Sequence, residues 1–308
     1  MSTAAGTPAT IQVDHLTRRF GEHVAVDDIS FLVPAGLMTG FVGGNGAGKT
    51  TTMRMIMGVL GIHAGQVCWG DRPITTADRR SIGYMPEERG LYPKQKVAQQ
   101  LVYLAQLKGM DAGSAKRVVE EHLERLGLAD RAGDNLEALS LGNQQRVQII
   151  AALMIRPAAL ILDEPFSGLD PAAVDAMADL LREHTARGVP VLFSSHQLDL
   201  VDRLCDRLII LAAGKVRAEG TPDELRGSAP KRHRLGVVGD AGWVRGTPGL
   251  HVLDVDGPQA VVELSEDDPA EQQRTLDALL SEGVRRGGVT ELTPIIPPLS
   301  DIYREATA

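Results

Sequence analysis

Cysteine is nearly absent from the chain. Its two cysteines, Cys68 and Cys205, are far apart in the sequence and lack the spacing of metal ligands. A disulfide framework needs several paired cysteines and a structural zinc site needs clustered ligands, so both are excluded as organising features. Two isolated thiols indicate a protein of a reducing compartment.

The chain also lacks a surplus of basic residues. Lys and Arg number 32 against 40 Asp and Glu, which gives a formal net charge of −8. Proteins that bind nucleic acid normally show the opposite balance, so the composition argues against a nucleic-acid scaffold. A phosphate ligand is still compatible with this charge, because backbone amides and one well-placed lysine can bind phosphate on an acidic protein.

Long apolar runs are missing as well. Met1–Thr10 has neither the basic start nor the apolar run of a signal peptide. No stretch approaches the roughly 20 apolar residues that span a bilayer. The best candidate, Ile149–Leu162, is interrupted by Arg156 and Pro157. These absences predict a cytosolic protein that meets a membrane only through a partner.

The composition is otherwise that of a globular protein. The 308 residues include 43% hydrophobic and 23% charged residues, which excludes general disorder and allows one large domain or two smaller ones. Short apolar runs predict strands at Thr39–Val42, Ala159–Leu162 and Val189–Phe193, and helical patterns are found at Asn143–Ile155 and Ala172–Arg187. Strands that alternate with helices predict a parallel sheet covered on both faces.

Three other regions complete the expected organisation. Ile11–Val33 alternates apolar and polar residues around a turn and predicts a hairpin or an edge-strand pair. Val97–Leu128 predicts an inserted helical subdomain. Arg226–Arg234 is rich in Gly, Ser, Pro and basic residues, which favours a solvated linker over a lipid-binding patch. A small α+β domain is expected beyond it, with strands at Leu250–Val255 and Gln259–Leu264 and helices at Pro269–Leu280 and Leu299–Ala306.

The residues from Gly43 to Thr50 fit the pattern G-x-x-x-x-G-K-[ST] of a phosphate-binding loop between a strand and a helix. Glycines let backbone N–H groups face inward around phosphate oxygens, and the following helix adds its positive end. Lys49 is expected to reach the β- and γ-phosphates and Thr50 to ligate magnesium. An ordinary glycine-rich turn is the weaker interpretation, because Lys and Thr stand at the required offset.

Asp163 and Glu164 follow the apolar run Leu160–Leu162. Carboxylates at the C-terminal edge of a parallel strand lie where α/β folds bind ligands. Asp163 is suited to hold magnesium through water, and Glu164 is then free to polarise an attacking water. Helix capping is the competing interpretation, which Pro165 and the turn after it weaken.

Three further features are ambiguous when each is taken alone. Ser140 and Gly142 at the start of a helix indicate an N-cap. His196 ends a buried strand, where a lone histidine is often structural. Phe20 could stack on a base, although an isolated aromatic residue in a hairpin usually belongs to the core.

In order and spacing, these features resemble the nucleotide-binding subunit of ABC transporters over about Ile11–Pro222. The matching motifs are the Walker A loop at Gly43–Thr51, the Walker B strand at Leu160–Glu164, the signature at Leu139–Gln144, the D-loop at Ser167–Asp170 and the switch histidine His196. The phosphate loop alone indicates only a generic nucleotidase, whereas the complete set identifies the family. The resemblance implies an α/β fold, that of a P-loop NTPase of the ABC type, with a helical subdomain at about residues 88–155.

The resemblance assigns a role to each motif residue. It implies that Glu164 is the general base and that Lys49 and His196 contact the phosphates of ATP. The ATP-binding residues that it implies are Phe20, Asn45, Gly46, Ala47, Gly48, Lys49, Thr50 and Thr51. The implied magnesium ligands are Thr50, Asp163 and Glu87. Ser140, Gly142, Asn143 and Asp170 would contact the ATP held by a second copy of the subunit, so hydrolysis needs a homodimer with two ATPs at its interface.

The chain departs from the family pattern at a few positions. Gly44 stands where many relatives have proline, Leu141 and Asn143 replace the commoner Gly and Gln of the signature, and Glu87 replaces a glutamine that ligates magnesium. Glu87 can still coordinate magnesium, but its added charge near the phosphates is unfavourable.

Two segments resemble one branch of the family, the ATPases of ABC-2 exporters, which include drug, antibiotic and sodium exporters. These segments are Pro86–Tyr92 and Gln144–Gln148, and Pro298–Tyr303 resembles the accessory domain of that branch. We therefore expect an ABC ATPase domain at residues 11–225, followed by a linker and accessory domain at 226–308. The implied partner is an ABC-2 permease that docks on the helical segment, which would place the chain at the cytoplasmic face of the cell membrane.

Two other functions compete with an exporter subunit. A soluble ABC ATPase of translation normally carries two cassettes, whereas this chain has one phosphate loop, and the interval from Thr51 to Leu139 is too short for the coiled coil of DNA-repair relatives. The acidic balance also disfavours nucleic acid. A small-molecule kinase would leave the signature without a role. The transported substrate cannot be predicted, because its pocket would lie in another polypeptide.

Overall fold

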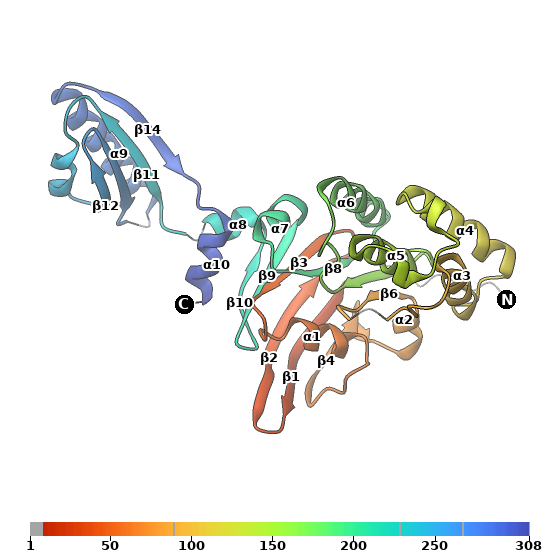
Figure 1. Ribbon diagram of the computed structural model, residues 1–308. Coiled ribbons are helices and arrows are strands. Elements are labelled where there is room, and N and C mark those ends of the chain that lie inside the picture. Colours follow the sequence, from red (N-terminus) through yellow and green to blue (C-terminus); the bar gives the residue numbers. More distant parts are fainter. Residues whose placement is uncertain (1–8, 89, 228, 267, 308) are drawn as a thin grey trace. The chain divides into compact units, whose positions relative to one another are not determined.

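The computed structural model describes residues 9–88, 90–227, 229–266 and 268–307 (Figure 1). Most of the N-terminal segment and Arg89 of the branch motif lie outside these ranges. In the part of the chain that is described, no helix is both long and apolar enough to cross a membrane. The chain forms two compact units. The larger contains the described residues up to Pro222 together with Tyr303 and the residues after it, and the smaller is Asp223–Ile302.

An antiparallel sheet opens the larger unit, with the spatial strand order β2-β1-β4-β5. Its strands are β1 (Ile11–Phe20), β2 (His23–Val33), β4 (Ala64–Trp69) and β5 (Arg72–Pro73). β1 and β2 form the predicted hairpin, whose turn has Gly21 at φ 58°. Apolar residues of these strands, such as Ile11 and Phe31, join one core with the second sheet.

The second sheet has the order β10-β9-β3-β8-β7-β6. Its strands are β3 (Met38–Gly43), β6 (Ile82–Met85), β7 (Ala159–Leu162), β8 (Val191–Ser195), β9 (Arg207–Ala212) and β10 (Lys215–Gly220). All neighbours are parallel except β9 and β10. Every residue of β3, β7 and β8 is buried, which explains their uninterrupted apolar sequences. The predicted parallel sheet is confirmed.

Helices connect the strands of the larger unit (Figure 1). They are α1 (Lys49–Ile56), α2 (Thr76–Arg80), α3 (Val97–Leu107), α4 (Ala112–Arg125), α5 (Leu141–Leu153), α6 (Pro171–Thr185) and α7 (Leu198–Leu204). The predicted helical stretch Val97–Leu128 is divided into α3 and α4. The division follows from two residues: Gly109 at φ 97° lies beyond the end of α3, and the Asp111 side chain caps α4 by accepting from Ser114 N–H at 2.9 Å.

The smaller unit is an α+β structure with its own core. Its sheet has the order β12-β13-β11-β14, and all its neighbouring strands are antiparallel. Its elements are β11 (Arg232–Val237), β12 (Leu250–Asp256), β13 (Gln259–Leu264), α9 (Pro269–Arg285) and β14 (Val289–Ile295), and α8 (Pro222–Gly227) and α10 (Leu299–Thr307) lie at its two connections to the larger unit. Buried Leu235, Val262 and Leu279 join the sheet to α9.

Two expectations for this region are wrong. Arg232–Arg234 belongs to the central strand β11 rather than to a solvated linker. The strand was not recognised because its first three residues are basic and do not show the apolar alternation of a strand. Arg232 is paired with Glu263 of β13 at 2.9 Å, so its charge is accommodated within the sheet. The helix predicted to end at Leu280 continues to Arg285, and β14 was not predicted.

Candidate active site

The loop between β3 and α1 is shaped by glycines. Gly46 and Gly48 have φ values of 77° and 106°, in the left-handed region that favours glycine. A Cβ on Gly48 would lie 2.7 Å from the Ala25 carbonyl oxygen, so no larger residue fits there. Lys49 is buried at the first position of α1, and its Nζ donates to the Gly43 carbonyl at 2.5 Å and to that of Gly44 at 3.3 Å. The lysine charge is thus held inside the loop by acceptors that an incoming anion can replace.

A cavity of about 370 Å³ opens beside this loop. It is lined by Phe20, His23, Ala25, the residues 44–51, Glu87, Asp163 and Glu164. Eleven of the residues expected to serve the nucleotide or its metal therefore meet in one place: Phe20, the seven residues 45–51, Glu87, Asp163 and Glu164. Phe20 is 47% exposed at the end of β1, with the Arg18 guanidinium 4.8 Å from its ring centroid.

Carboxylate and hydroxyl oxygens are among the groups that line the cavity, from Thr50, Glu87 and Asp163. Asp163 is 1% exposed; its Oδ1 accepts a hydrogen bond from Ser194 Oγ at 2.6 Å, and its Oδ2 is buried without a hydrogen-bond partner. The Thr50 hydroxyl donates to the Glu87 carboxylate at 3.3 Å. The described residues form no cluster of three or more His, Cys, Asp or Glu that could hold a metal. Mg²⁺ fits these oxygens nevertheless, because it commonly uses few carboxylates and takes its other ligands from hydroxyl, water and phosphate.

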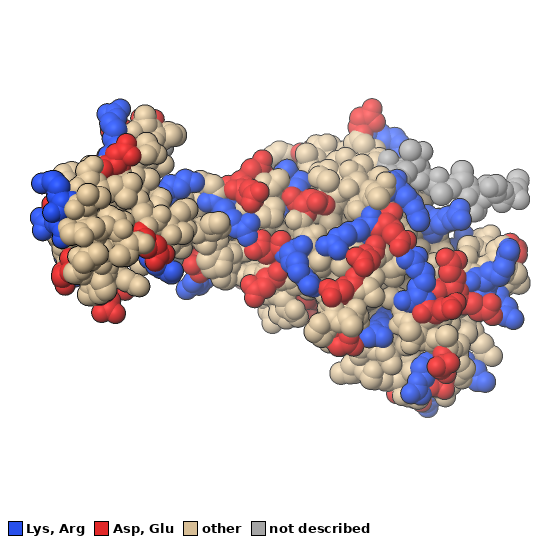
Figure 2. Space-filling view, turned by 90° about the horizontal axis from the view of Figure 1, so that it is seen from above, with Lys and Arg blue, Asp and Glu red and all other residues tan. Residues whose placement is uncertain are grey.

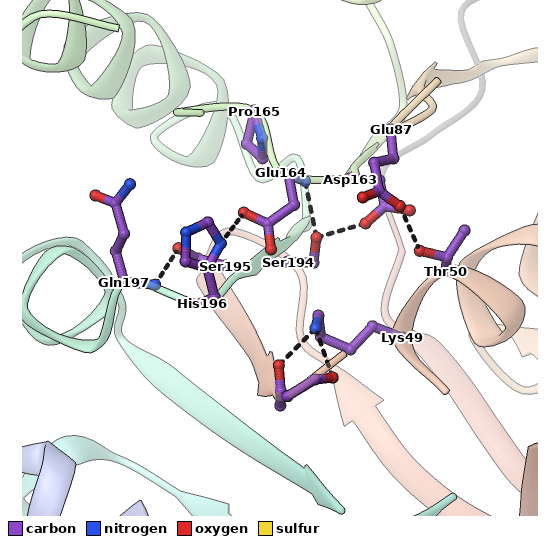
Figure 3. A network of polar contacts seen from close by, with 12 residues as sticks. Lys49, Thr50, Glu87, Asp163, Glu164, Pro165, Ser194, Ser195, His196 and Gln197 are labelled. Atoms are coloured by element: carbon purple, nitrogen blue, oxygen red, sulfur yellow. Dashed lines mark hydrogen bonds and ion pairs between the residues drawn. The ribbon is translucent and has the colours of Figure 1, made fainter. Parts of the chain in front are cut away.

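Glu164 has an unusual backbone conformation. Its φ of 50° lies in the left-handed region, which costs a non-glycine residue about 1–2 kcal/mol. Its N–H donates to Ser194 Oγ at 2.8 Å, and its carbonyl accepts from Gln145 Nε2 at 2.9 Å. Its carboxylate lies 3.0 Å from His196 Nδ1 (Figure 3). We call Asp163, Glu164, Ser194 and His196 the Glu164 cluster.

Ser140–Asn143, called here the signature segment, is arranged differently. Ser140 caps α5, and its Oγ accepts from Asn143 N–H at 3.4 Å. Leu141 is 62% exposed. A Cβ on Gly142 would lie 2.9 Å from the Gly168 carbonyl, so glycine allows close contact with the D-loop. None of Ser140, Gly142 and Asn143 lines the cavity, and neither does Asp170, which caps α6 and pairs with Arg146 at 2.9 Å.

Sequence reasoning missed several of these contacts. Ser194, Gln145 and Arg146 hold other site residues in place, but no motif pattern assigned them this task. A signal for Ser194 was present: β7 and β8 are neighbouring parallel strands with Leu162 opposite Phe193, which places the next residues, Asp163 and Ser194, side by side. That register becomes visible only once the two strands are paired.

Gly44 shows where a later part of the chain reaches the loop. A Cβ on Gly44 would lie 3.5 Å from the Tyr303 hydroxyl, an ordinary contact distance. Tyr303 belongs to α10 and to the larger unit. The absence of a side chain at Gly44 therefore leaves space beside Tyr303.

Two family models match the chain. Residues 26–167 match the model described as "ABC transporter", and residues 220–307 match "ATP-binding protein DrrA1-3-like, C-terminal domain". The chain is similar to the uncharacterized ABC transporter ATP-binding protein YhaQ of Bacillus subtilis (strain 168), with 46% identity over 72% of this chain and 75% of that protein.

Two further relatives add to this comparison. The linearmycin resistance ATP-binding protein LnrL of Bacillus subtilis (strain 168) is 35% identical over 70% of each chain. A solved structure titled as the ATP-binding subunit of an ABC transporter is 33% identical, with a TM-score of 0.65, over 70% of this chain and 91% of that one. The larger unit thus shares both sequence and fold with nucleotide-binding subunits.

Proposed function

Since the chain belongs to the ATP-binding proteins of ABC transporters, we propose that the cavity beside Gly43–Thr50 is its ATP site and that the Glu164 cluster supports the hydrolysis. The chain is an ATPase subunit that powers a separate exporter permease. The observation that carries the residue assignment is the meeting of Lys49, Asp163 and Glu164 in one cavity.

Nucleotide binding follows from the geometry of the loop. The backbone N–H groups of residues 45–51 and the start of α1 provide donors and positive potential for phosphate oxygens. The Lys49 ammonium exchanges the carbonyls of Gly43 and Gly44 for the β- and γ-phosphates. Phe20, which lines the cavity and is half-exposed, offers a ring on which adenine stacks in this proposal.

Magnesium would be held by Thr50, Asp163 and Glu87, directly or through water. The unpartnered Oδ2 of Asp163 is the strongest support, because a buried carboxylate oxygen is unfavourable without a proton donor or a cation. When bound, the ion supplies positive charge that neutralises the phosphates.

Hydrolysis needs a base beside the γ-phosphate. Glu164 lies at the cavity edge, and its carboxylate accepts a proton from an attacking water in this proposal. His196 pairs with that carboxylate at 3.0 Å and orients it. In this proposal the signature segment and Asp170, which do not line the cavity, complete the site of a second copy of the chain. Two ATPs would then lie at the interface of a head-to-tail homodimer.

The proposed partner is an ABC-2 permease at the cytoplasmic face of the cell membrane. The similarity of residues 220–307 to the DrrA1-3-like domain and the name of the linearmycin resistance relative support an export role. Acidic and basic side chains are interspersed over the face of the larger unit seen in Figure 2, which suits a protein partner better than a nucleic acid. Tyr92, 60% exposed beside Leu91, is a candidate contact with that permease.

Fractionation tests the permease assignment. We expect the chain to be found with membranes when the permease is present and to lose that association in a Tyr92→Asp variant. Val59→Asp, at another exposed apolar position (70% exposed), is the matched control and is expected to stay with membranes. A pool that is entirely soluble, bound to ribosomes or DNA, and unaffected by loss of any permease would contradict the exporter function.

A further inference from the structure

Ser194 lies between the two carboxylate residues of the Glu164 cluster. It is fully buried at the end of β8. Its Oγ is 2.6 Å from Asp163 Oδ1 and 2.8 Å from the backbone nitrogen of Glu164 (Figure 3). One side chain from a neighbouring strand therefore contacts both acidic residues of the proposed site.

The direction of these two hydrogen bonds is fixed. The Glu164 N–H can only donate, so Ser194 Oγ accepts from it. Ser194 Oγ then donates its single hydroxyl proton to Asp163 Oδ1, because of the two contacting atoms, Glu164 N and Asp163 Oδ1, the carboxylate oxygen is the acceptor. Bonds to a charged carboxylate are the stronger kind, so the arrangement resists rotation of the Asp163 side chain. It also leaves Oδ2 as the oxygen without a partner.

The same hydroxyl supports an unfavourable backbone. Glu164 has a φ of 50°, an unfavourable conformation that persists only where several surrounding contacts hold the backbone in place. Here Ser194 Oγ accepts from the N–H of Glu164, and the Glu164 carbonyl accepts from Gln145 Nε2 and from the Ser167 N–H. Two residues after Ser194 in the same chain segment, His196 contacts the Glu164 carboxylate. The end of β8 thus holds both the backbone and the side chain of the proposed base.

We propose that Ser194 is a positioning residue, which fixes the Glu164 carboxylate relative to Asp163 without touching the nucleotide. This inference rests on the proposed role of Glu164 as the base. Ser195 provides the contrast. It is also buried, at 3% exposure, but its Oγ accepts from Gln197 N–H at 3.0 Å and bonds to neither carboxylate.

Ser194→Ala and Ser195→Ala form the matched pair of variants. We expect Ser194→Ala to lower kcat roughly 10- to 100-fold, because small displacements of a reacting group have effects of this size. The KM for ATP and the affinity for a fluorescent ATP analogue should change by less than about threefold, since no nucleotide contact is lost. Ser195→Ala should leave kcat within about threefold. Equal losses of kcat in both variants would overturn the proposal.

A double-mutant cycle with Glu164→Gln separates positioning from general support of the fold. If Ser194 acts through Glu164, Ser194→Ala should lower kcat in the wild-type background but leave the residual rate of Glu164→Gln within about threefold. All four proteins are assayed below the lowest of their melting temperatures. An equal loss in both backgrounds would overturn the positioning role. Full activity of Glu164→Gln would instead contradict the proposed base, and would do so independently of Ser194.

Discussion

The Glu164 cluster and the signature segment both contain polar side chains, but they differ in which contacts hold those side chains. In the cluster, Asp163, Glu164 and His196 are connected by hydrogen bonds that originate from two neighbouring strands and from α5. In the signature segment, Ser140 Oγ makes a local hydrogen bond as a helix cap, and Leu141 is exposed. A region whose geometry is determined by its own chain can be complete before assembly. The start of α5 is instead exposed at Leu141 and close-packed at Gly142, and such a surface can contact a second copy of the chain.

Glu164→Gln is expected to have the largest effect on the cluster. Removal of the base should lower turnover at least about 100-fold, while ATP binding stays within about threefold of wild type. Lys49→Ala should instead weaken binding itself, because it removes a phosphate contact. Fluorescent-nucleotide titration and steady-state ATPase assays measure both quantities.

Asp199→Asn is the control for this pair, since Asp199 is exposed at the start of α7 and does not line the cavity. It should retain both turnover and affinity. If Glu164→Gln and Lys49→Ala lose ATP affinity to the same extent, the division of roles between cluster and loop is wrong.

Mixed dimers test whether the signature segment serves the other copy. Chains with Ser140→Arg and chains with Lys49→Ala should each be inactive alone. An equimolar mixture should regain about one quarter of wild-type activity, because half of randomly formed dimers contain one intact site.

The matching control is a chain that carries both substitutions, mixed with either single variant, which should regain nothing. If the first mixture also stays at the level of its parents, the signature segment does not complete the partner's site independently.

Glu87→Gln is expected to have a smaller effect, on the affinity for ATP, since Glu87 lines the cavity together with the loop and with Asp163 and Glu164. The Glu87 carboxylate shares the cavity with the phosphates, so without a cation it should repel them. In EDTA we expect the variant to bind ATP about two- to fivefold more tightly than wild type, and this advantage should disappear in excess Mg²⁺. Glu88→Gln, which removes an exposed carboxylate 3.5 Å from Arg54, is the control. A gain of equal size in both variants would indicate a general effect of net charge.

A separate effect, on stability rather than on ATP binding or turnover, concerns α6, whose N-terminus Asp170 caps. Burial, helped by the nearby charges of Arg187 and His122, lowers the pKa of His184 from 6.5 to about 4. Below pH 6.5 His184 therefore takes up a proton in the unfolded chain but stays neutral in the folded chain until the pH approaches 4. The free energy of unfolding consequently decreases as the pH falls from 6.5 towards 4. The decrease should reach at most about 2 kcal/mol at pH 5. Denaturant titrations at pH 7 and 5 measure it, and His184→Gln should remove most of the difference.

The sequence predicted the elements whose signal is local. The glycine loop, the apolar strand before Asp163 and the cap residue Ser140 each have a pattern that determines their own backbone. β11 was missed because its first three residues are basic, and a strand is recognised from apolar alternation. Ser194 and Gln145 were missed for a different reason. Their partners are 19 to 31 residues away, so the contacts depend on strand register and helix packing.

The return of Tyr303 to the larger unit affects how this protein is made. The smaller unit, Asp223–Ile302, is inserted between two parts of the larger one. A ribosome adds residues at about 5–20 per second, so the roughly 80 residues of the insertion delay the arrival of Tyr303 by some 4–16 s. During that interval the nascent larger unit has its phosphate loop but lacks the hydroxyl that lies beside Gly44. Pulse proteolysis of chains stalled before and after Tyr303 would show whether the loop becomes protected only when α10 emerges.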